Sequence, residues 1–181
     1  EIVHVVRDAV EQASREVYQL ATGDKGKAGM GTTLTMVVVV GEKGVMGHVG
    51  DSRLYLCRKG QLYHLSEDHS YVNEMVKRGM LTPEQAEESP YANVITRAVG
   101  IQSSVQVDTL VFDICPDDTY LICSDGLSRY TLDEAELADI LSDEDAEGLP
   151  SRLVDLANER GGKDNITTLI LRADADDLKA D

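Results

Sequence analysis

The sequence contains no tryptophan and only one phenylalanine, and aromatic residues make up 4% of its 181 residues. Valine, leucine and isoleucine must therefore fill the core. Positive charge is also scarce, because 17 lysines and arginines face 33 acidic residues and leave a net charge of −16. Such a field repels nucleic acid and anionic membrane surfaces, so neither is an expected partner. The charge suits a protein that holds cations.

Long apolar runs are missing as well. The run at 35–40 has the length of a strand and is far too short to span a membrane. There is no secretory signal pattern. The three cysteines, Cys57, Cys115 and Cys123, are odd in number and lack metal-ligand spacing. This favours reduced, buried thiols and a cytoplasmic location.

The chain length predicts one domain with a sizeable core over 1–173, followed by an acidic tail over 174–181. Apolar spacing predicts a helix at the N-terminus, and short apolar segments separated by glycine turns predict antiparallel hairpins. Runs of strands interrupted by helix pairs favour an α+β fold. The expected helices are 2–21, 70–79, one from Pro83, 132–141 after a Thr131 cap, and 150–162; the expected strands are 32–40, 45–49, 52–58, 61–65, 105–114, 119–123 and 166–173.

Three aspartates occur at strand ends beside glycine: Asp51 in "HVGDSR", Asp125 in "LICSDGLS" and Asp164 in "GGKDNIT". Each alone is explained by the frequent use of aspartate in turns, with Gly126 permitting a tight turn after Asp125. The repetition favours a second interpretation, in which the three carboxylates meet. They would then need a cation to stay ionised together, and an all-oxygen ligand set suits Mg²⁺ or Mn²⁺. Two such ions can activate water for displacement at phosphorus.

Six short segments occur in order along the chain: "GMGTT" (29–33), "HVGDSR" (48–53), "SEDHS" (66–70), "ITRAVG" (95–100), "CSDGLS" (123–128) and "GGKDNIT" (161–167). Together they resemble the bacterial branch of the metal-dependent protein phosphatases, the protein phosphatase 2C family. The resemblance covers nearly the whole chain and depends on the order of the segments, because each alone is a weak signal. It implies a β-sandwich of two packed antiparallel sheets flanked by helix pairs.

The same resemblance implies an activity and its ligands. Members of the family hydrolyse phosphoserine and phosphothreonine in proteins by attack of metal-bound water, with two or three Mn²⁺ or Mg²⁺ ions and no phospho-enzyme. Asp125 and Asp164 match ligands of the first ion, and Asp51 with Asp125 matches the ligands of a third. The implied partner is a phosphoprotein whose phosphate is added by a serine/threonine kinase.

The family's N-terminal motifs are absent from this sequence. They comprise an arginine that grips phosphate, an acidic pair and an Asp-Gly-x-Gly-Gly stretch. Gly29–Gly31 is not that stretch, because Ala28 precedes it. The chain also opens on Glu1 and not on methionine. This favours the interpretation that the chain is a piece of a longer protein and lacks the first strands of the fold. The alternatives are a catalytically silent phosphatase-like module that binds or regulates a partner, and a purely structural cation-binding domain.

Two further features have competing interpretations. His69 is either a catalytic residue or a structural one, and its position between Asp68 and Ser70 at an expected helix start favours the structural role. The helical pair expected within 69–94 corresponds to the mobile flap beside the active site of bacterial family members. An ordinary helical hairpin explains the same pattern, and the two interpretations are compatible.

Overall fold

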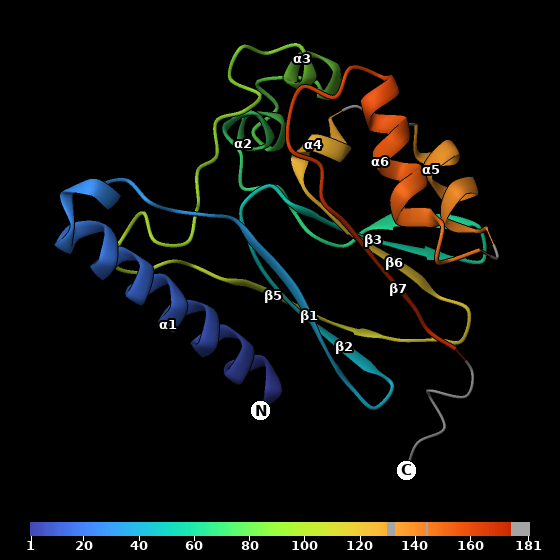
Figure 1. The fold of residues 1–181 in the computed structure, drawn as a ribbon, viewed down its shortest axis with the longest axis horizontal. Helices are drawn as coiled ribbons and strands as arrows, with labels where there is room; N and C mark the ends of the chain where they lie inside the picture. Colours follow the sequence, from blue (N-terminus) through green and yellow to red (C-terminus); the bar gives the residue numbers. More distant parts are fainter. Residues whose placement is uncertain (130–132, 144, 175–181) are drawn as a thin grey trace. The chain divides into compact units, whose positions relative to one another are not determined.

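Two sheets form the framework, and their strand orders are β1-β2-β5 and β4-β3-β6-β7 (Figure 1). The computed structural model describes residues 1–129, 133–143 and 145–174. The strands are β1 (Leu34–Val40), β2 (Lys43–Val49), β3 (Arg53–Arg58), β4 (Gln61–His64), β5 (Asp108–Asp113), β6 (Thr119–Cys123) and β7 (Thr168–Arg172). The helices are α1 (Ile2–Gly23), the 3₁₀ helix η1 (Lys25–Lys27), α2 (Tyr71–Lys77), α3 (Pro83–Glu87), α4 (Asp125–Ser128), α5 (Glu134–Leu141) and α6 (Leu149–Glu159).

The predicted α+β class with two antiparallel sheets and helices is confirmed. Within the described residues no helix combines the length and apolar character that a membrane crossing needs. The chain divides into two units: the first contains 1–37, 45–51 and 68–110, and the second contains 38–44, 52–67 and the residues from Val111 onward. Residues 175–181 of the predicted acidic tail lie outside the described part.

In the first unit, α1 packs through an apolar stripe against β2 and nearby loops. Val10 joins Val49 and two further valines in a buried cluster. Gly47 of β2 leaves room for this contact, because a Cβ there would lie 2.7 Å from Cγ1 of Val6. The buried hydroxyl of Ser14 accepts a hydrogen bond from the backbone N–H of Gly100 at 3.0 Å. The helix is therefore fixed by both apolar and polar contacts.

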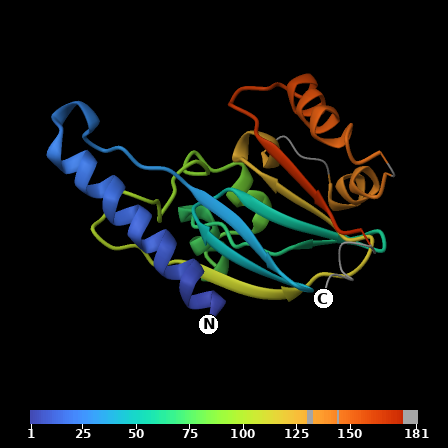
Figure 2. The same cartoon turned by 60° about the horizontal axis from the view of Figure 1, so that its bottom comes forward.

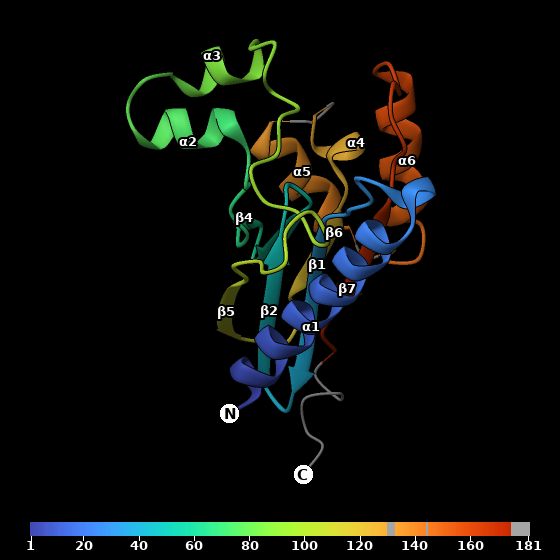
Figure 3. The same ribbon diagram turned by 90° about the vertical axis from the view of Figure 1, so that its left-hand side faces the viewer.

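The helices α2 and α3 form the predicted helical hairpin of this unit (Figure 3). α3 begins at Pro83, as the sequence predicts, and Thr82 caps it in a capping box with Gln85. Ser70 caps α2 by accepting from the backbone N–H of Asn73. Polar caps at both starts explain why such short helices form here.

In the second unit, α5 and α6 cover the β4-β3-β6-β7 sheet (Figure 2). Eight of the eleven residues in the core between them are aliphatic, in line with the scarcity of aromatic residues. None of the three cysteines is in a disulfide. Cys57 and Cys123 are buried as predicted, whereas Cys115 is only partly buried. The core residues are Tyr55, Cys57, Leu121, Cys123, Leu127, Leu137, Ile140, Leu141, Leu149, Leu153 and Ala157.

The predicted start of one helix is wrong. α5 begins at Glu134, and Asp133 is its N-cap, with a side chain that accepts from the backbone N–H of Glu136 at 2.8 Å. Aspartate is a stronger N-cap than threonine, which explains the shift. Thr131, the cap predicted from the sequence, lies outside the described residues. The short helix α4 was not predicted from the sequence either.

A buried carboxylate closes the turn that leads into β6. Asp118 has no exposed surface. It accepts hydrogen bonds from Nε and Nη2 of Arg58 at 2.7 and 2.6 Å, and from the hydroxyl of Tyr120 at 2.9 Å. The backbone N–H of Cys115 is a further donor. Burial opposes ionisation, but these hydrogen bonds outweigh it and lower the pKa of Asp118.

We expect Asp118→Asn to reduce the free energy of unfolding by about 3 kcal/mol at pH 7, because it breaks a buried ion pair. Because the pKa of Asp118 is lowered by folding, the ion pair contributes its full stability at pH values above the ordinary aspartate pKa of about 3.9. That contribution is lost as the pH falls below this value. Denaturant unfolding should therefore show a gap between the wild type and the variant that narrows below about pH 4.

The exposed neighbour Asp117 gives a matched control. Asp117→Asn should change stability by less than about 0.5 kcal/mol, because asparagine tolerates the positive φ of 68° found there. If the difference in the free energy of unfolding between the wild type and Asp118→Asn stayed constant down to about pH 3, the role of Asp118 as an ionised partner of Arg58 would be contradicted.

Candidate metal centre

Asp125 is the first residue of α4, at the point where the buried strand β6 ends. Ser124 separates it from Cys123, and Asp125 itself is partly exposed. Its carboxylate pairs with Nη2 of Arg129, one helical turn later, at 2.9 Å. The core strand thus delivers an acid to the sheet edge, where an arginine neutralises it.

The pairing of β6 with β7 explains why Asp125 and Asp164 belong to the same edge. The two strands are antiparallel, and Cys123 lies opposite Thr168. Residues that follow β6 therefore lie beside residues that precede β7. Asp164 is in that preceding loop, where its carboxylate accepts the backbone N–H of Asn165 at 2.7 Å.

Ser124 ties the two loops together directly. Its hydroxyl donates to the carbonyl oxygen of Asn165 at 3.1 Å and accepts from the N–H of Thr167 at 3.0 Å. Its own backbone N–H donates to the carbonyl oxygen of Thr167 at 3.0 Å. Ser124 precedes Asp125, and Asn165 follows Asp164. These three hydrogen bonds, which we call the Ser124 clamp, fix the backbone beside both acids.

Gly126 is required for space. A Cβ at this position would lie 2.2 Å from the carbonyl oxygen of Asn165. Gly126 is not among the glycines with positive φ. The prediction that Gly126 serves a tight turn is therefore wrong. Glycine is needed because the loop that carries Asp164 occupies the space that a side chain would fill.

Asp51 belongs to the other unit, just after β2. The residue before it, Gly50, has a φ of +117°, and a Cβ there would lie 2.4 Å from Cγ2 of Thr33. Both facts demand glycine. The structure thus brings together the loops of Asp125 and Asp164, while the approach of Asp51 to them stays a prediction.

His69 has the structural role that the sequence favoured. The residue is 2% exposed, and its ring contacts Gly50 and Asp108. Arg97 donates to the other oxygen of Asp108. Burial disfavours the charge on Asp108, but the hydrogen bonds from His69 and Arg97 more than compensate and lower its pKa. Sequence reasoning missed Asp108, since it begins an ordinary strand 39 residues beyond His69.

The ligand chemistry fits a hard cation. Within the described ranges, no three histidine, cysteine, aspartate or glutamate side chains already converge on one point. Asp125 and Asp164 nevertheless offer carboxylate oxygens from loops held by the Ser124 clamp. Mg²⁺ is usually held by one or two carboxylates and several waters, so two acids on one edge are sufficient as protein ligands. A bound cation would take over the charge compensation that Arg129 provides for Asp125.

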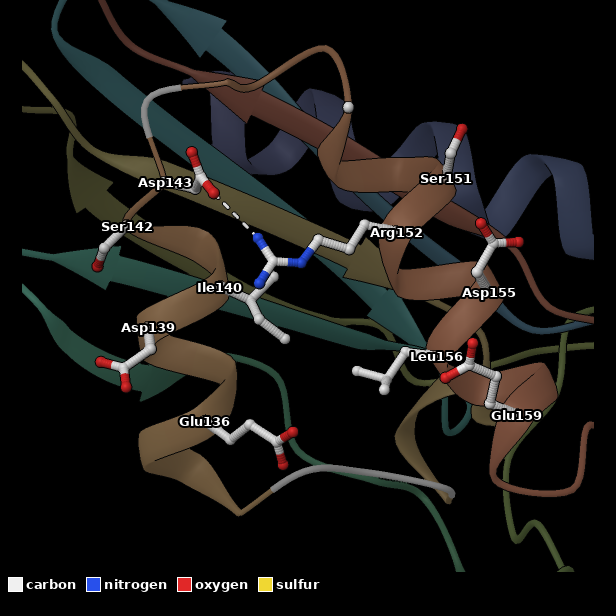
Figure 4. Close-up of a pocket in the computed structure, with 11 residues that line it drawn as sticks. Glu136, Asp139, Ile140, Ser142, Asp143, Ser151, Arg152, Asp155, Leu156 and Glu159 are labelled. Atoms are coloured by element: carbon white, nitrogen blue, oxygen red, sulfur yellow. Dashed lines mark hydrogen bonds and ion pairs between the residues drawn. The ribbon is translucent and has the colours of Figure 1, made fainter.

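A separate open groove lies between α5 and α6, with a volume of about 750 Å³ (Figure 4). Five of its eleven lining residues are acidic, and ion pairs compensate part of that charge. Arg152 pairs with Asp143 at 2.9 Å, and Arg160 pairs with Glu136 at 2.7 Å. Asp125 and Asp164 are not among its lining residues. The groove is therefore distinct from the candidate metal centre.

Known proteins resemble the chain in both sequence and structure. Residues 2–75 match the family described as Protein phosphatase 2C. The chain is 36% identical over 175 residues to the serine/threonine phosphatase stp of Listeria monocytogenes, and the matched region spans 96% of this chain and 69% of the relative.

Two solved structures extend the comparison. The serine/threonine phosphatase Stp1 of Staphylococcus aureus superimposes with a TM-score of 0.90 at 31% identity, over 95% of this chain and 68% of that one. The catalytic domain of the serine/threonine phosphatase PstP, solved with two manganese ions, gives a TM-score of 0.84 at 31% identity, over 94% of this chain and 70% of that one.

We expect Gly126→Ala to open the Ser124 clamp, because the new methyl group would collide with the carbonyl oxygen of Asn165. The free energy of unfolding should fall by about 2 kcal/mol, as for other overpacked sites. Calorimetric titration should also show weaker Mn²⁺ binding.

Gly23, the last residue of α1, has open space on the side where a Cβ would stand, with no other atom within 4 Å. Gly23→Ala is therefore the control. It should not lower the free energy of unfolding, because alanine is the better helix former, and it should leave Mn²⁺ binding unchanged. If Gly126→Ala unfolded at the wild-type denaturant concentration and bound Mn²⁺ normally, the clamp would have no role in metal binding.

Proposed function

Because this chain belongs to the protein phosphatase 2C family and is a metal-dependent serine/threonine protein phosphatase, we propose that Asp51, Asp125 and Asp164 hold its divalent cations. The Ser124 clamp is the observation that carries this proposal. It joins two loops whose bonded residues, Ser124 and Asn165, are 41 positions apart in sequence. Each loop carries an aspartate at the same edge of one sheet. If these aspartates only formed turns, hydrogen bonds between the two loops would not be needed.

The finer identity of substrate and cation is also part of the proposal. The substrate is phosphoserine or phosphothreonine in proteins, and a serine/threonine kinase adds the phosphate. The cation is Mn²⁺ or Mg²⁺, since carboxylate ligands suit both. We further propose that residues 1–173 act as one phosphatase domain in the cytoplasm. None of the described residues favours a silent binding module over an enzyme.

The chain's own residues position the acids and balance their charge. Ser124 and Gly126 fix the backbone on both sides of Asp125. Cation binding therefore does not have to order this part of the backbone. Arg129 pairs with the Asp125 carboxylate at 2.9 Å and balances its charge while no cation is bound. When bound, divalent cations supply Lewis-acid stabilisation of phosphoryl oxygens and activation of water. Preorganised ligands lower the cost of holding them.

We expect Asp125→Ala to lower Mn²⁺-dependent turnover of a phosphothreonine peptide by roughly 100-fold or more, since metal ions contribute several kcal/mol to such reactions. The measurement uses the full-length protein that contains this chain, with phosphate release followed across a range of Mn²⁺ concentrations. Calorimetric titration should show a matching loss of Mn²⁺ binding.

Asp139 offers a matched control, because it is an exposed aspartate in the same unit, on α5. Asp139→Ala should remain within about twofold of the wild type, as surface substitutions usually do. Near-normal turnover and Mn²⁺ binding in Asp125→Ala would refute the ligand assignment.

A further inference from the structure

The ring of His69 holds the peptide group that precedes Asp51. The backbone N–H of Gly50 donates to Nδ1 of His69 at 3.0 Å, and the carbonyl oxygen of Gly50 accepts from the backbone N–H of His69 at 2.8 Å. Gly50 is therefore bound at both its polar groups by a single residue 19 positions away. Both residues are buried, so water does not replace these bonds easily.

These contacts require one tautomer of His69. Nδ1 must be unprotonated, because it accepts the N–H of Gly50. The ring proton of the neutral imidazole is then on Nε2, which lies 3.0 Å from Oδ2 of Asp108. The carboxylate accepts that proton's hydrogen bond. In a histidine, the bond made by one ring nitrogen sets the state of the other.

Arg97 fixes the carboxylate in turn. Its Nη1 donates to Oδ1 of Asp108 at 2.7 Å and to the carbonyl oxygen of Gln106 at 3.3 Å. The carboxylate is thus held between an arginine on one oxygen and His69 on the other. The order Arg97, Asp108, His69, Gly50 forms one chain of hydrogen bonds within the first unit, and it ends beside Asp51.

We propose that His69 is a positioning residue for Asp51, and that Asp108 and Arg97 maintain the tautomer with which it holds the Gly50 peptide. This inference rests on the proposed role of Asp51 as a metal ligand. Gly50 has a φ of +117° and little steric bias of its own, so external bonds must define its conformation. A shift of that peptide would move the Cα from which the Asp51 carboxylate extends.

The substitution Asp108→Asn tests the tautomer. Arg97 will keep the amide oxygen as its acceptor, which leaves the amide NH₂ facing Nε2 of His69. Nε2 must then accept a hydrogen bond from that amide, so the ring proton moves to Nδ1. Two donors, the Nδ1–H and the backbone N–H of Gly50, then face each other, and their hydrogen bond is lost. Nitrogen-15 spectra of the imidazole should show this change, and the Mn²⁺ concentration for half-maximal activity should rise about tenfold, as for other outer-shell changes.

Asp118→Asn is the matched control, because it also replaces a buried, arginine-paired carboxylate by an amide, but its partners are Arg58, Cys115 and Tyr120. It should shift the half-saturating Mn²⁺ concentration less than about twofold, because Asp118 precedes β6 whereas Asp125 follows that strand. The KM for a phosphothreonine peptide should stay unchanged in both variants at saturating Mn²⁺.

Substitutions of His69 itself distinguish the effect of its hydrogen-bond acceptor from the effect of the packing of its ring. In His69→Asn the side-chain oxygen can take the place of Nδ1 and accept from Gly50, so Mn²⁺ half-saturation should stay within about threefold of the wild type. His69→Leu has no acceptor and should raise it at least about tenfold. Rescue by asparagine would support positioning over simple packing.

Calorimetric Mn²⁺ titration of Asp51→Ala in the full-length protein distinguishes the two ways of failing. If Asp51→Ala weakens Mn²⁺ binding while Asp108→Asn behaves like Asp118→Asn, the positioning role is overturned and the metal centre stands. If Asp51→Ala leaves binding unchanged, Asp51 is not a ligand, and the inference is overturned with that assignment. Weaker binding in both Asp51→Ala and Asp108→Asn supports it.

Discussion

The antiparallel pairing of β6 with β7 is the constraint on which the candidate metal centre depends. It places the end of one strand beside the start of the other, although Asp125 and Asp164 are far apart in sequence. Ser124 then uses its hydroxyl and its backbone N–H to bind the adjoining loop. A metal site needs ligands that are already in place, since ordering two free loops would oppose binding.

Both units hold an aspartate by fixing the peptide next to it. In the second unit, Gly126 lets the neighbouring loop approach so closely that no side chain fits. In the first, Gly50 adopts a conformation open mainly to glycine, and His69 binds both of its polar groups. Each position admits only glycine, and a residue from elsewhere in the chain fixes the backbone beside the acid.

The sequence predicted the elements well and the contacts that support the candidate ligands poorly. The strands, the start of a helix at Pro83 and the three acids at strand ends follow from local patterns, which a single sequence displays. Asp108 and Arg97 could not be found in this way, because their importance comes from His69, which is distant in the chain. The close approach at Gly126 was likewise hidden, since it depends on the loop of Asn165. The start of α5 was misplaced because two competing caps lie close together in the chain.

Anomalous diffraction from crystals of the full-length protein grown with Mn²⁺ would test the central claim most directly. The account predicts a manganese ion about 2 Å from carboxylate oxygens of both Asp125 and Asp164, as hard cations require. The Ser124 clamp should remain intact, and Arg129 should have released Asp125. Manganese that contacts neither aspartate, with the pair between Asp125 and Arg129 retained, would contradict it.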